Sequence, residues 1–275
     1  MFEEHHVRSA TPEPLLALHN VCADVIEDGA SQRLLHDVSF SLQPGRVVGL
    51  AGQSGSGKTL TCRSILQLLD PAIRINGSIR LRGDELNGMT EEQLRTIRGN
   101  DIGYIVQNPM NALASVHTIG SQFVESIRTH ARCSKKDALT LAVQALESVR
   151  LPDPPELLKR YPFELSGGML QRVLIALTMC LSPSIVIADE PTTALDTINQ
   201  YHVLEELERL RMNQDVAILL ITHDLDVIAE MADEVIVMHE GRIVEHNDVL
   251  SIFNRPQHSY TQELLRSRLN EWREE

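Results

Sequence analysis

The segment GQSGSGKT, residues 52–59, constrains the fold of this chain more than any other stretch of its sequence. It matches the pattern G-x-x-x-x-G-K-[ST], in which glycines let backbone N–H groups converge on phosphate oxygens. Such a loop lies between a buried strand and the N-terminus of a helix, whose dipole favours an anion. GRVVGLAG (45–52) has the apolar character of that strand, and TLTCRSILQLL (59–69) has the periodicity of that helix. The sequence therefore predicts a phosphate-binding loop in an α/β fold.

This loop also predicts how a nucleoside triphosphate is held. Lys58 is expected to reach the β- and γ-phosphates, and the hydroxyl of Thr59 is expected to ligate Mg²⁺. The alternative is a flexible Gly/Ser loop without a ligand, which the flanking strand and helix disfavour. The loop residues that we expect to bind the nucleotide are Gly52, Gln53, Ser54, Gly55, Ser56, Gly57, Lys58 and Thr59.

SIVIADE (184–190) supplies the second element that such a site needs. Its apolar residues predict a buried strand that ends in Asp189 and Glu190. Asp189 can face Mg²⁺ through water, and Glu190 can polarise the water that attacks the γ-phosphate. A strand that ends in two acids is a weak signal by itself, and it gains weight because it follows the loop in the expected order. Together the two segments indicate a nucleoside triphosphatase.

Alternating strand and helix patterns predict a largely parallel sheet covered by helices. Further strand-like segments are LLALHNVCADVI (15–26), DVSFSL (37–42), DIGYIVQ (101–107), VAILLITHD (216–224) and the hairpin DEVIVMHEGRIVEHN (233–247). The first two predict an antiparallel pair. Helical periodicity dominates from about 110 to 180, apart from a proline-rich break at LPDPPE (151–156), and it returns at NQYHVLEELERLRM (199–212).

Composition excludes several classes of function. The formal net charge of the 275 residues is -13, which disfavours binding to nucleic acid or to anionic lipid. No apolar stretch is long enough to span a membrane, and the N-terminal segment lacks the apolar core of a signal peptide. The four cysteines are far apart and form no C-x-x-C pair, which indicates reduced thiols, as in a cytosolic protein.

The stretch ELSGGMLQRVLIAL (164–177) places two glycines at the start of an apolar-rich helix. Exposed N–H groups at that helix N-terminus would form a second anion site. LSGGM (165–169) resembles the LSGGQ signature of ATP-binding-cassette (ABC) ATPases, in which two cassettes close head to tail around two ATP molecules. The resemblance implies that the nucleotide of a partner subunit is held by Leu165, Ser166, Gly167, Gly168 and Met169.

The remaining ABC motifs follow in the family's order, and the resemblance covers roughly residues 15–265. Gln107, in YIVQNP, resembles the loop glutamine that contacts ATP and Mg²⁺ and couples to the membrane partner. Asp196, in TALD, resembles the aspartate that lies at the subunit interface. His223, in LLITHD, resembles the switch histidine that contacts the γ-phosphate, and with Glu190 it forms the expected catalytic pair.

The resemblance implies a P-loop, RecA-like ABC nucleotide-binding domain with an N-terminal antiparallel β subdomain and an inserted α-helical subdomain. We expect a polar tail at 1–14, the ATPase domain at 15–250 and a C-terminal extension at 251–275, with the helical subdomain at about 110–180. The expected cofactors are ATP and Mg²⁺. The expected ligands of Mg²⁺ are Thr59, Gln107 and Asp189.

Two positions depart from the family pattern. The signature ends in Met169 rather than glutamine, so the site loses an amide near the nucleotide, and we expect slower hydrolysis where this signature is used. The position of the adenine-stacking aromatic residue is matched by Val25, with Ile26 beside it, and neither side chain can π-stack. We therefore expect only apolar contact with the base and weak discrimination between ATP and GTP.

The cargo is inferred from kinship among ABC ATPases. FNRPQHSYTQELL (253–265) is similar to a segment of the ATPases of oligopeptide, dipeptide and nickel importers, and QNPMNALASVHTIGSQ (107–122) resembles the same group. SGSGKTLTC and YPFELSGGMLQR (161–172) are most similar to the D-type ATPase of nickel importers. Nickel, whether free, chelated or metallophore-bound, is the first expected cargo, and peptides are the alternative. A non-transport ABC ATPase and a regulatory module without hydrolysis are more distant alternatives.

The resemblance also implies the assembly. We expect a heterodimer with a second, similar ATPase, two permease subunits on separate chains and an extracytoplasmic solute-binding protein, with no nucleic acid. The chain is then a peripheral subunit at the cytoplasmic face of the inner membrane, with permease contacts at about 108–121. No cysteine follows Cys180, so no iron–sulfur cluster is expected, and nickel itself is not expected to contact this chain.

Overall fold

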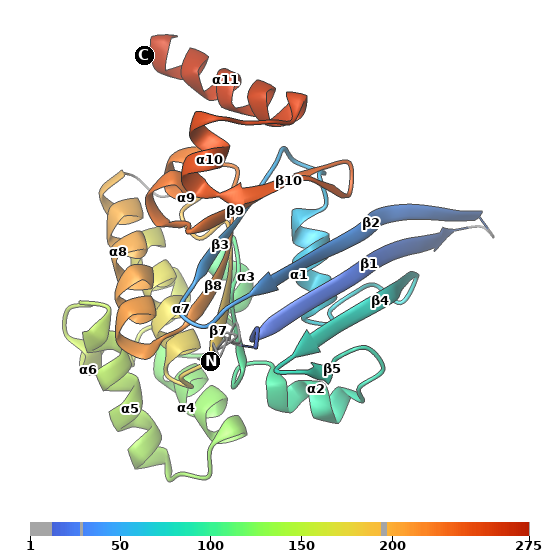
Figure 1. The fold of residues 1–275 in the computed structure, drawn as a ribbon. Helices are drawn as coiled ribbons and strands as arrows, with labels where there is room; N and C mark the ends of the chain where they lie inside the picture. The colour runs from blue at the N-terminus through green and yellow to red at the C-terminus, as the bar shows by residue number, and fades with distance from the viewer. Residues whose placement is uncertain (1–12, 28–29, 194–196, 275) are drawn as a thin grey trace, which may run out of the picture.

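The structure of this protein is a computed structural model that describes residues 13–27, 30–193 and 197–274. Its strands form one large sheet and one small sheet. Figure 1 shows the small sheet to one side of the large one, with a group of helices at the lower left and the C-terminal helix at the top.

The large sheet contains, in spatial order, β10 (Arg242–Asp248), β9 (Glu234–His239), β3 (Val47–Ala51), β8 (Ala217–Ile221), β7 (Ile185–Asp189) and β6 (Ile102–Ile105). Neighbouring strands pair in parallel, except that β9 and β10 form the predicted antiparallel hairpin. Every residue of β3, β7 and β8 is buried, because both faces of this part of the sheet are covered. The burial explains why continuous apolar runs mark these strands in the sequence.

The small sheet is antiparallel and contains, in spatial order, β2 (Ala30–Leu42), β1 (Leu16–Glu27), β4 (Ile73–Leu81) and β5 (Asp84–Glu85). The predicted pairing of the first two strands is confirmed, with Val21 opposite Val38. Strand β2 begins at Ala30 rather than at the predicted Asp37. Strand β4 is missing from the predictions because Gly77 and alternating polar residues interrupt its apolar pattern.

A mainly helical region contains α3 (Pro109–Ala112), α4 (Ile119–His130), α5 (Lys135–Ser148), α6 (Pro154–Leu157) and α7 (Gly167–Met179). The other α-helices of the described residues are α1 (Lys58–Ile65), α2 (Glu91–Ile97), α8 (Thr197–Gln214), α9 (Leu225–Met231), α10 (Val249–Asn254) and α11 (Ser259–Glu274). In Figure 1, helices α4, α5 and α6 lie on the side of the large sheet away from the small sheet. The predicted α/β fold class is confirmed by this arrangement.

The large sheet separates two hydrophobic clusters. Successive residues of a strand point to opposite faces. Accordingly, Val47 and Ala51 of β3 pack with residues of the helical region, whereas Val48 and Leu50 pack with the small sheet. Strand β3 is therefore held from both sides, which fixes the position of the loop that follows it.

One local prediction is wrong in detail, and another is confirmed. The helix predicted over 59–69 ends at Ile65, because Gln67 has a φ of 52° and a right-handed helix cannot continue through it. The break in the helical pattern predicted at the proline-rich stretch 151–156 is confirmed, since α5 ends at Ser148 and α6 begins at Pro154, a position in the first turn where proline is tolerated. Among the described residues, no helix is both long enough and apolar enough to cross a bilayer.

Candidate functional site

The loop between β3 and α1 follows a path that requires glycine at several positions. Gly52 has a φ of 147°, and a Cβ there would lie 2.3 Å from the carbonyl oxygen of Met238. Gly57 has a φ of 106°, and its Cβ would lie 2.8 Å from Leu35 Cδ2. Gly55, with a φ of 81°, faces open space. One side of the loop therefore packs against β9 and β2, and the other side is open to a ligand.

Lys58 begins α1 and turns its ammonium group back into the loop. Its Nζ donates to the carbonyl oxygens of Gly52 at 2.5 Å and Gln53 at 3.0 Å, which occupies two of its three donors. Burial lowers the pKa of Lys58, and the charges of Glu190 and Asp189 oppose this shift. The third donor can reach an anion, so the side chain is oriented for a phosphate oxygen.

Asp189 ends β7 with a carboxylate that is buried in the same region. Its residue exposure is 5%, and its Oδ2 accepts a hydrogen bond from Tyr104 Oη at 3.1 Å. Burial raises the pKa of Asp189, and the hydrogen bond from Tyr104 opposes this shift. Burial, followed by the Asp189 charge, raises the pKa of the Tyr104 hydroxyl, which keeps it a donor. A buried carboxylate of this kind is stabilised by a nearby cation.

Glu190, the next residue, has a backbone φ of 51°, a strained conformation that is uncommon outside glycine. Its backbone N–H donates to the carbonyl oxygen of Ile221 at 2.8 Å. Its carboxylate accepts hydrogen bonds from Thr193 Oγ1 at 2.9 Å and from Thr222 Oγ1 at 3.2 Å. The backbone N–H of His223 donates to Oε1 at 3.0 Å, and His223 Nδ1 lies 2.8 Å from that oxygen. A carboxylate fixed from several sides is suited to orient and activate a water molecule.

A cavity of about 710 Å³ brings most of the predicted nucleotide-binding residues together at the carboxyl edge of the large sheet. It is lined by Leu34, Gln53, Ser54, Gly55, Gly57, Lys58, Thr59, Leu60, Gln107, Asp189, Glu190 and His223. Gly52 and Ser56 lie behind this lining, and Ser56 is buried. The apolar part of the lining comes from Leu34 and Leu60 rather than from Val25, and no Phe, Tyr or Trp among the described residues is part of it.

Three residues that line this cavity carry oxygen atoms of the kind that Mg²⁺ prefers. Thr59 contributes a hydroxyl, Gln107 an amide and Asp189 a carboxylate to the cavity wall. Proteins commonly bind Mg²⁺ through one or two carboxylates, with water and substrate phosphates as the other ligands. The residues present therefore fit Mg²⁺ that is bound together with a nucleotide.

The signature residues form a separate helix N-terminus. Ser166 caps α7, as its Oγ accepts the backbone N–H of Met169 at 3.3 Å. A Cβ on Gly167 would meet no atom within 4 Å, and Ser166 and Gly167 are both exposed, so the start of α7 is open to solvent. None of residues 165–169 lines the 710 Å³ cavity, so the structure does not bring the signature to this chain's own phosphate-binding loop. Leu165 is buried, and the Met169 side chain packs against the hydrophobic core.

We expect Gly168→Ala to have a melting temperature at least about 2 °C below that of Gly167→Ala. A Cβ on Gly168 would lie 2.6 Å from Asn199 Cγ, whereas a Cβ on Gly167 meets open space. The two positions are adjacent in the first turn of α7, so the gain in helix propensity is similar for both and cancels in the comparison. Thermal unfolding of both variants measures the difference, and equal melting temperatures would contradict the packing seen at Gly168.

Several residues that orient the carboxylates are absent from the sequence predictions. Tyr104 holds Asp189, and Thr193 and Thr222 hold Glu190. Each lies within or beside a recognised motif, which is the signal that could have found them. Asp196, predicted at the subunit interface, lies outside the described residues.

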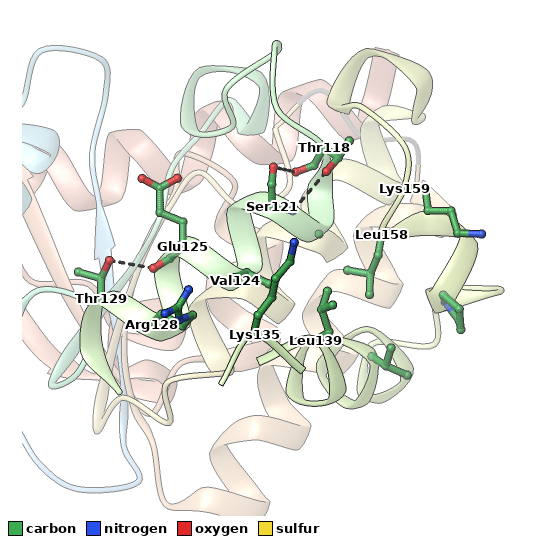
Figure 2. Close-up of a pocket in the computed structure, with 13 residues that line it drawn as sticks. Thr118, Ser121, Val124, Glu125, Arg128, Thr129, Lys135, Leu139, Leu158 and Lys159 are labelled. Atoms are coloured by element: carbon green, nitrogen blue, oxygen red, sulfur yellow. Dashed lines mark hydrogen bonds between the residues drawn. The ribbon is translucent and has the colours of Figure 1, made fainter. Parts of the chain in front are cut away.

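A second cavity, of about 1050 Å³, lies among α4, α5 and α6 (Figure 2). Figure 2 shows the apolar side chains of Val124, Leu139 and Leu158, with Lys135 and Lys159 beside them. No residue predicted to bind nucleotide or Mg²⁺ lines this cavity.

Comparison with known proteins places this site in a family. The family model described as "ABC transporter" matches residues 35–193, which include both the phosphate-binding loop and the signature. This chain belongs to the ABC transporter family. The match also covers Asp189 and Glu190.

Two relatives and one solved structure illustrate this membership. A probable peptide ABC transporter ATP-binding protein of Sinorhizobium fredii is 44% identical over 237 residues, covering 86% of this chain and 71% of the relative. A metal-staphylopine import system ATP-binding protein of Staphylococcus aureus is 40% identical over 241 residues, covering 88% of this chain and 89% of the relative. A dimeric ATP-binding cassette bound to ADP and Pi has a TM-score of 0.75 at 24% identity, covering 85% of this chain and 98% of that one.

As an ABC transporter ATPase, the chain binds and hydrolyses ATP. The structure of this ABC ATPase places its phosphate-binding loop, its acidic strand end and His223 around one cavity. Its signature helix lies outside that cavity. The fold is that of the solved cassette.

Proposed function

We propose that this ABC ATPase is the motor subunit of a bacterial importer of nickel, which is carried free, chelated or bound to a metallophore. The observation that carries the cargo assignment is the relative named as a metal-staphylopine import ATPase, which matches nearly the full length of both chains. Peptide import is the second candidate, because a relative named as a probable peptide transporter ATPase is 44% identical.

In the proposed mechanism, Lys58 and the loop amides bind the β- and γ-phosphates of ATP. Glu190 orients the attacking water and accepts its proton, and His223, 2.8 Å from the Glu190 carboxylate, contacts the γ-phosphate. Mg²⁺ held by Thr59, Gln107 and Asp189 would neutralise phosphate charge when it is bound. The hydrogen bonds that already fix Glu190 support this role, because a preorganised base needs little rearrangement during the reaction.

We propose that a second, similar ATPase completes the site. The exposed N-terminus of α7 supports this, because a helix N-terminus favours an anion and residues 165–169 do not line this chain's own cavity. In a head-to-tail dimer, residues 165–169 would hold the γ-phosphate of the partner's ATP. Asp196 would lie at the same interface.

Two permease subunits and an extracytoplasmic solute-binding protein are the other proposed partners, with this chain at the cytoplasmic face of the inner membrane. The segment 108–121 is proposed to contact the permease. Exposed apolar side chains support this, since Met110 is 39% and Val116 is 79% exposed. Within the chain, we propose an ATPase domain at 15–250 and an extension at 251–275.

The cargo is tested by uptake of labelled nickel and of a labelled dipeptide in cells that lack this chain. We expect wild-type protein to restore nickel uptake and to leave dipeptide uptake unchanged. Restoration of dipeptide uptake alone would move the cargo assignment to peptides and leave the ATPase assignment intact. A strain without other nickel importers is required, because a redundant importer would mask the loss.

A further inference from the structure

The C-terminal extension contacts the phosphate-binding loop directly, through Tyr260. This residue lies in the first turn of α11 and is only 8% exposed. Its Oη accepts a hydrogen bond from the backbone N–H of Gln53 at 3.0 Å. The two residues are 207 positions apart, so the contact is a product of the fold and not of a local motif.

The peptide group between Gly52 and Gln53 transmits this contact to the site. A planar trans peptide points its N–H and its C=O in opposite directions. The N–H of this peptide faces Tyr260, and its C=O, which belongs to Gly52, accepts a hydrogen bond from Lys58 Nζ at 2.5 Å. One peptide group is thus held between the tyrosine hydroxyl and the ammonium group that is aimed at the cavity.

Tyr260 is itself fixed by its surroundings. Its ring stacks on His239 at the end of β9, with ring centroids 3.9 Å apart and an interplanar angle of 26°. The segment before α11 is tied to β10, because the Glu245 carboxylate accepts the backbone N–H groups of Gln257 at 2.8 Å and His258 at 3.0 Å. The ring stacking and the ties to β10 therefore fix the position of the Tyr260 hydroxyl beside the loop.

A separate hydrogen bond holds the other end of the phosphate-binding loop, at Ser56. The backbone N–H of Gly241, in the turn between β9 and β10, donates to the carbonyl oxygen of Ser56 at 2.9 Å. The β9–β10 hairpin thus holds Ser56, and the extension that follows this hairpin holds Gln53. Of these two anchors, only the one at Gln53 depends on a side-chain hydroxyl, so it can be removed by a conservative substitution.

We propose that Tyr260 is a positioning residue for ATP binding, which orients the Gly52–Gln53 peptide so that the Gly52 carbonyl holds Lys58 toward the phosphates. The start of the extension is then part of the machinery of the nucleotide site. The inference rests on the proposed phosphate-binding role of Lys58. Without the hydroxyl, the partly buried Gln53 N–H loses its partner and the peptide is free to turn, which releases Lys58 from its orientation.

The test is Tyr260→Phe, which keeps the ring and its stacking on His239. We expect the Kd of the full chain for a fluorescent ATP analogue to rise about three- to tenfold. In the assembled transporter the KM for ATP should rise by a similar factor, with kcat within about twofold of wild type, because the substitution affects binding and not the base. The matched control is Tyr201→Phe on α8, where the side chain is largely exposed and the Kd should not change.

A double-mutant cycle with Lys58→Ala separates positioning from general loosening of the fold. If Tyr260 acts through Lys58, Tyr260→Phe has no further effect on the Kd once Lys58 is truncated. An unchanged Kd in the single variant, or the same fold-change in both backgrounds, would overturn the proposal. A wild-type chain that fails to bind the analogue would instead contradict the ATP site itself, so the two failures are distinguishable.

Discussion

Replacing Glu190 with glutamine lowers the kcat of ATP hydrolysis at least about 100-fold in the assembled transporter, which is the scale that general-base catalysis contributes. The side chain keeps its size, but an amide cannot accept the proton of the attacking water. The amide NH₂ also replaces one carboxylate oxygen, either Oε2, to which Thr193 and Thr222 now donate, or Oε1, to which the His223 N–H donates. The affinity for ATP should stay within a few-fold of wild type, because the phosphates are held by the loop and Lys58. Steady-state hydrolysis and nucleotide titration measure the two quantities.

The control for this substitution is Glu92→Gln, an exposed carboxylate in the first turn of α2. It makes the same chemical change away from the cavity and should leave kcat and KM unchanged. Wild-type hydrolysis by Glu190→Gln would show that another group accepts the proton.

Replacing Lys58 with alanine raises the Kd for ATP at least about thirtyfold. The phosphates lose a positively charged hydrogen-bond donor in a site from which water is partly excluded. The melting temperature of the nucleotide-free chain should fall much less than the loss of ATP affinity would suggest. Burial lowers the pKa of Lys58, so the cost of burying the ammonium charge offsets part of what its hydrogen bonds contribute to folding. A large loss of ATP affinity without a comparable loss of stability indicates that a residue acts in binding rather than in folding.

Lys136→Ala is the matched control, since this lysine is exposed on α5 and lies away from the cavity. Its Kd for ATP should equal that of wild type. A Lys58→Ala chain that binds ATP as tightly as this control would contradict the proposed role of the phosphate-binding loop.

Much of the nucleotide site could be predicted because its residues are tied to strand ends. The loop after β3, Glu190 after β7 and His223 after β8 each follow a buried apolar run that is visible in the sequence. Parallel strands place their carboxyl ends at one edge of the sheet, so the sequence order of these motifs was enough to expect them together. The signature could be placed at a helix N-terminus because its two glycines directly precede an apolar-rich helical pattern.

The remainder depends on contacts between distant segments, which no local pattern reveals. The Tyr260 hydroxyl meets Gln53 only because the extension folds back over the end of β9. The packing of Gly168 against Asn199 likewise brings α7 and α8 together. Strand β4 has no continuous apolar run, because Gly77 and polar residues interrupt it, so only its pairing with β1 in the structure reveals it.

The most direct test of the motor function is nickel uptake in cells that lack this chain and carry either wild type or Glu190→Gln. We expect wild type to restore uptake and Glu190→Gln to leave it at the level of the deletion, with both proteins present in equal amount at the membrane. Uptake restored equally by both proteins would contradict the claim that ATP hydrolysis by this chain drives import.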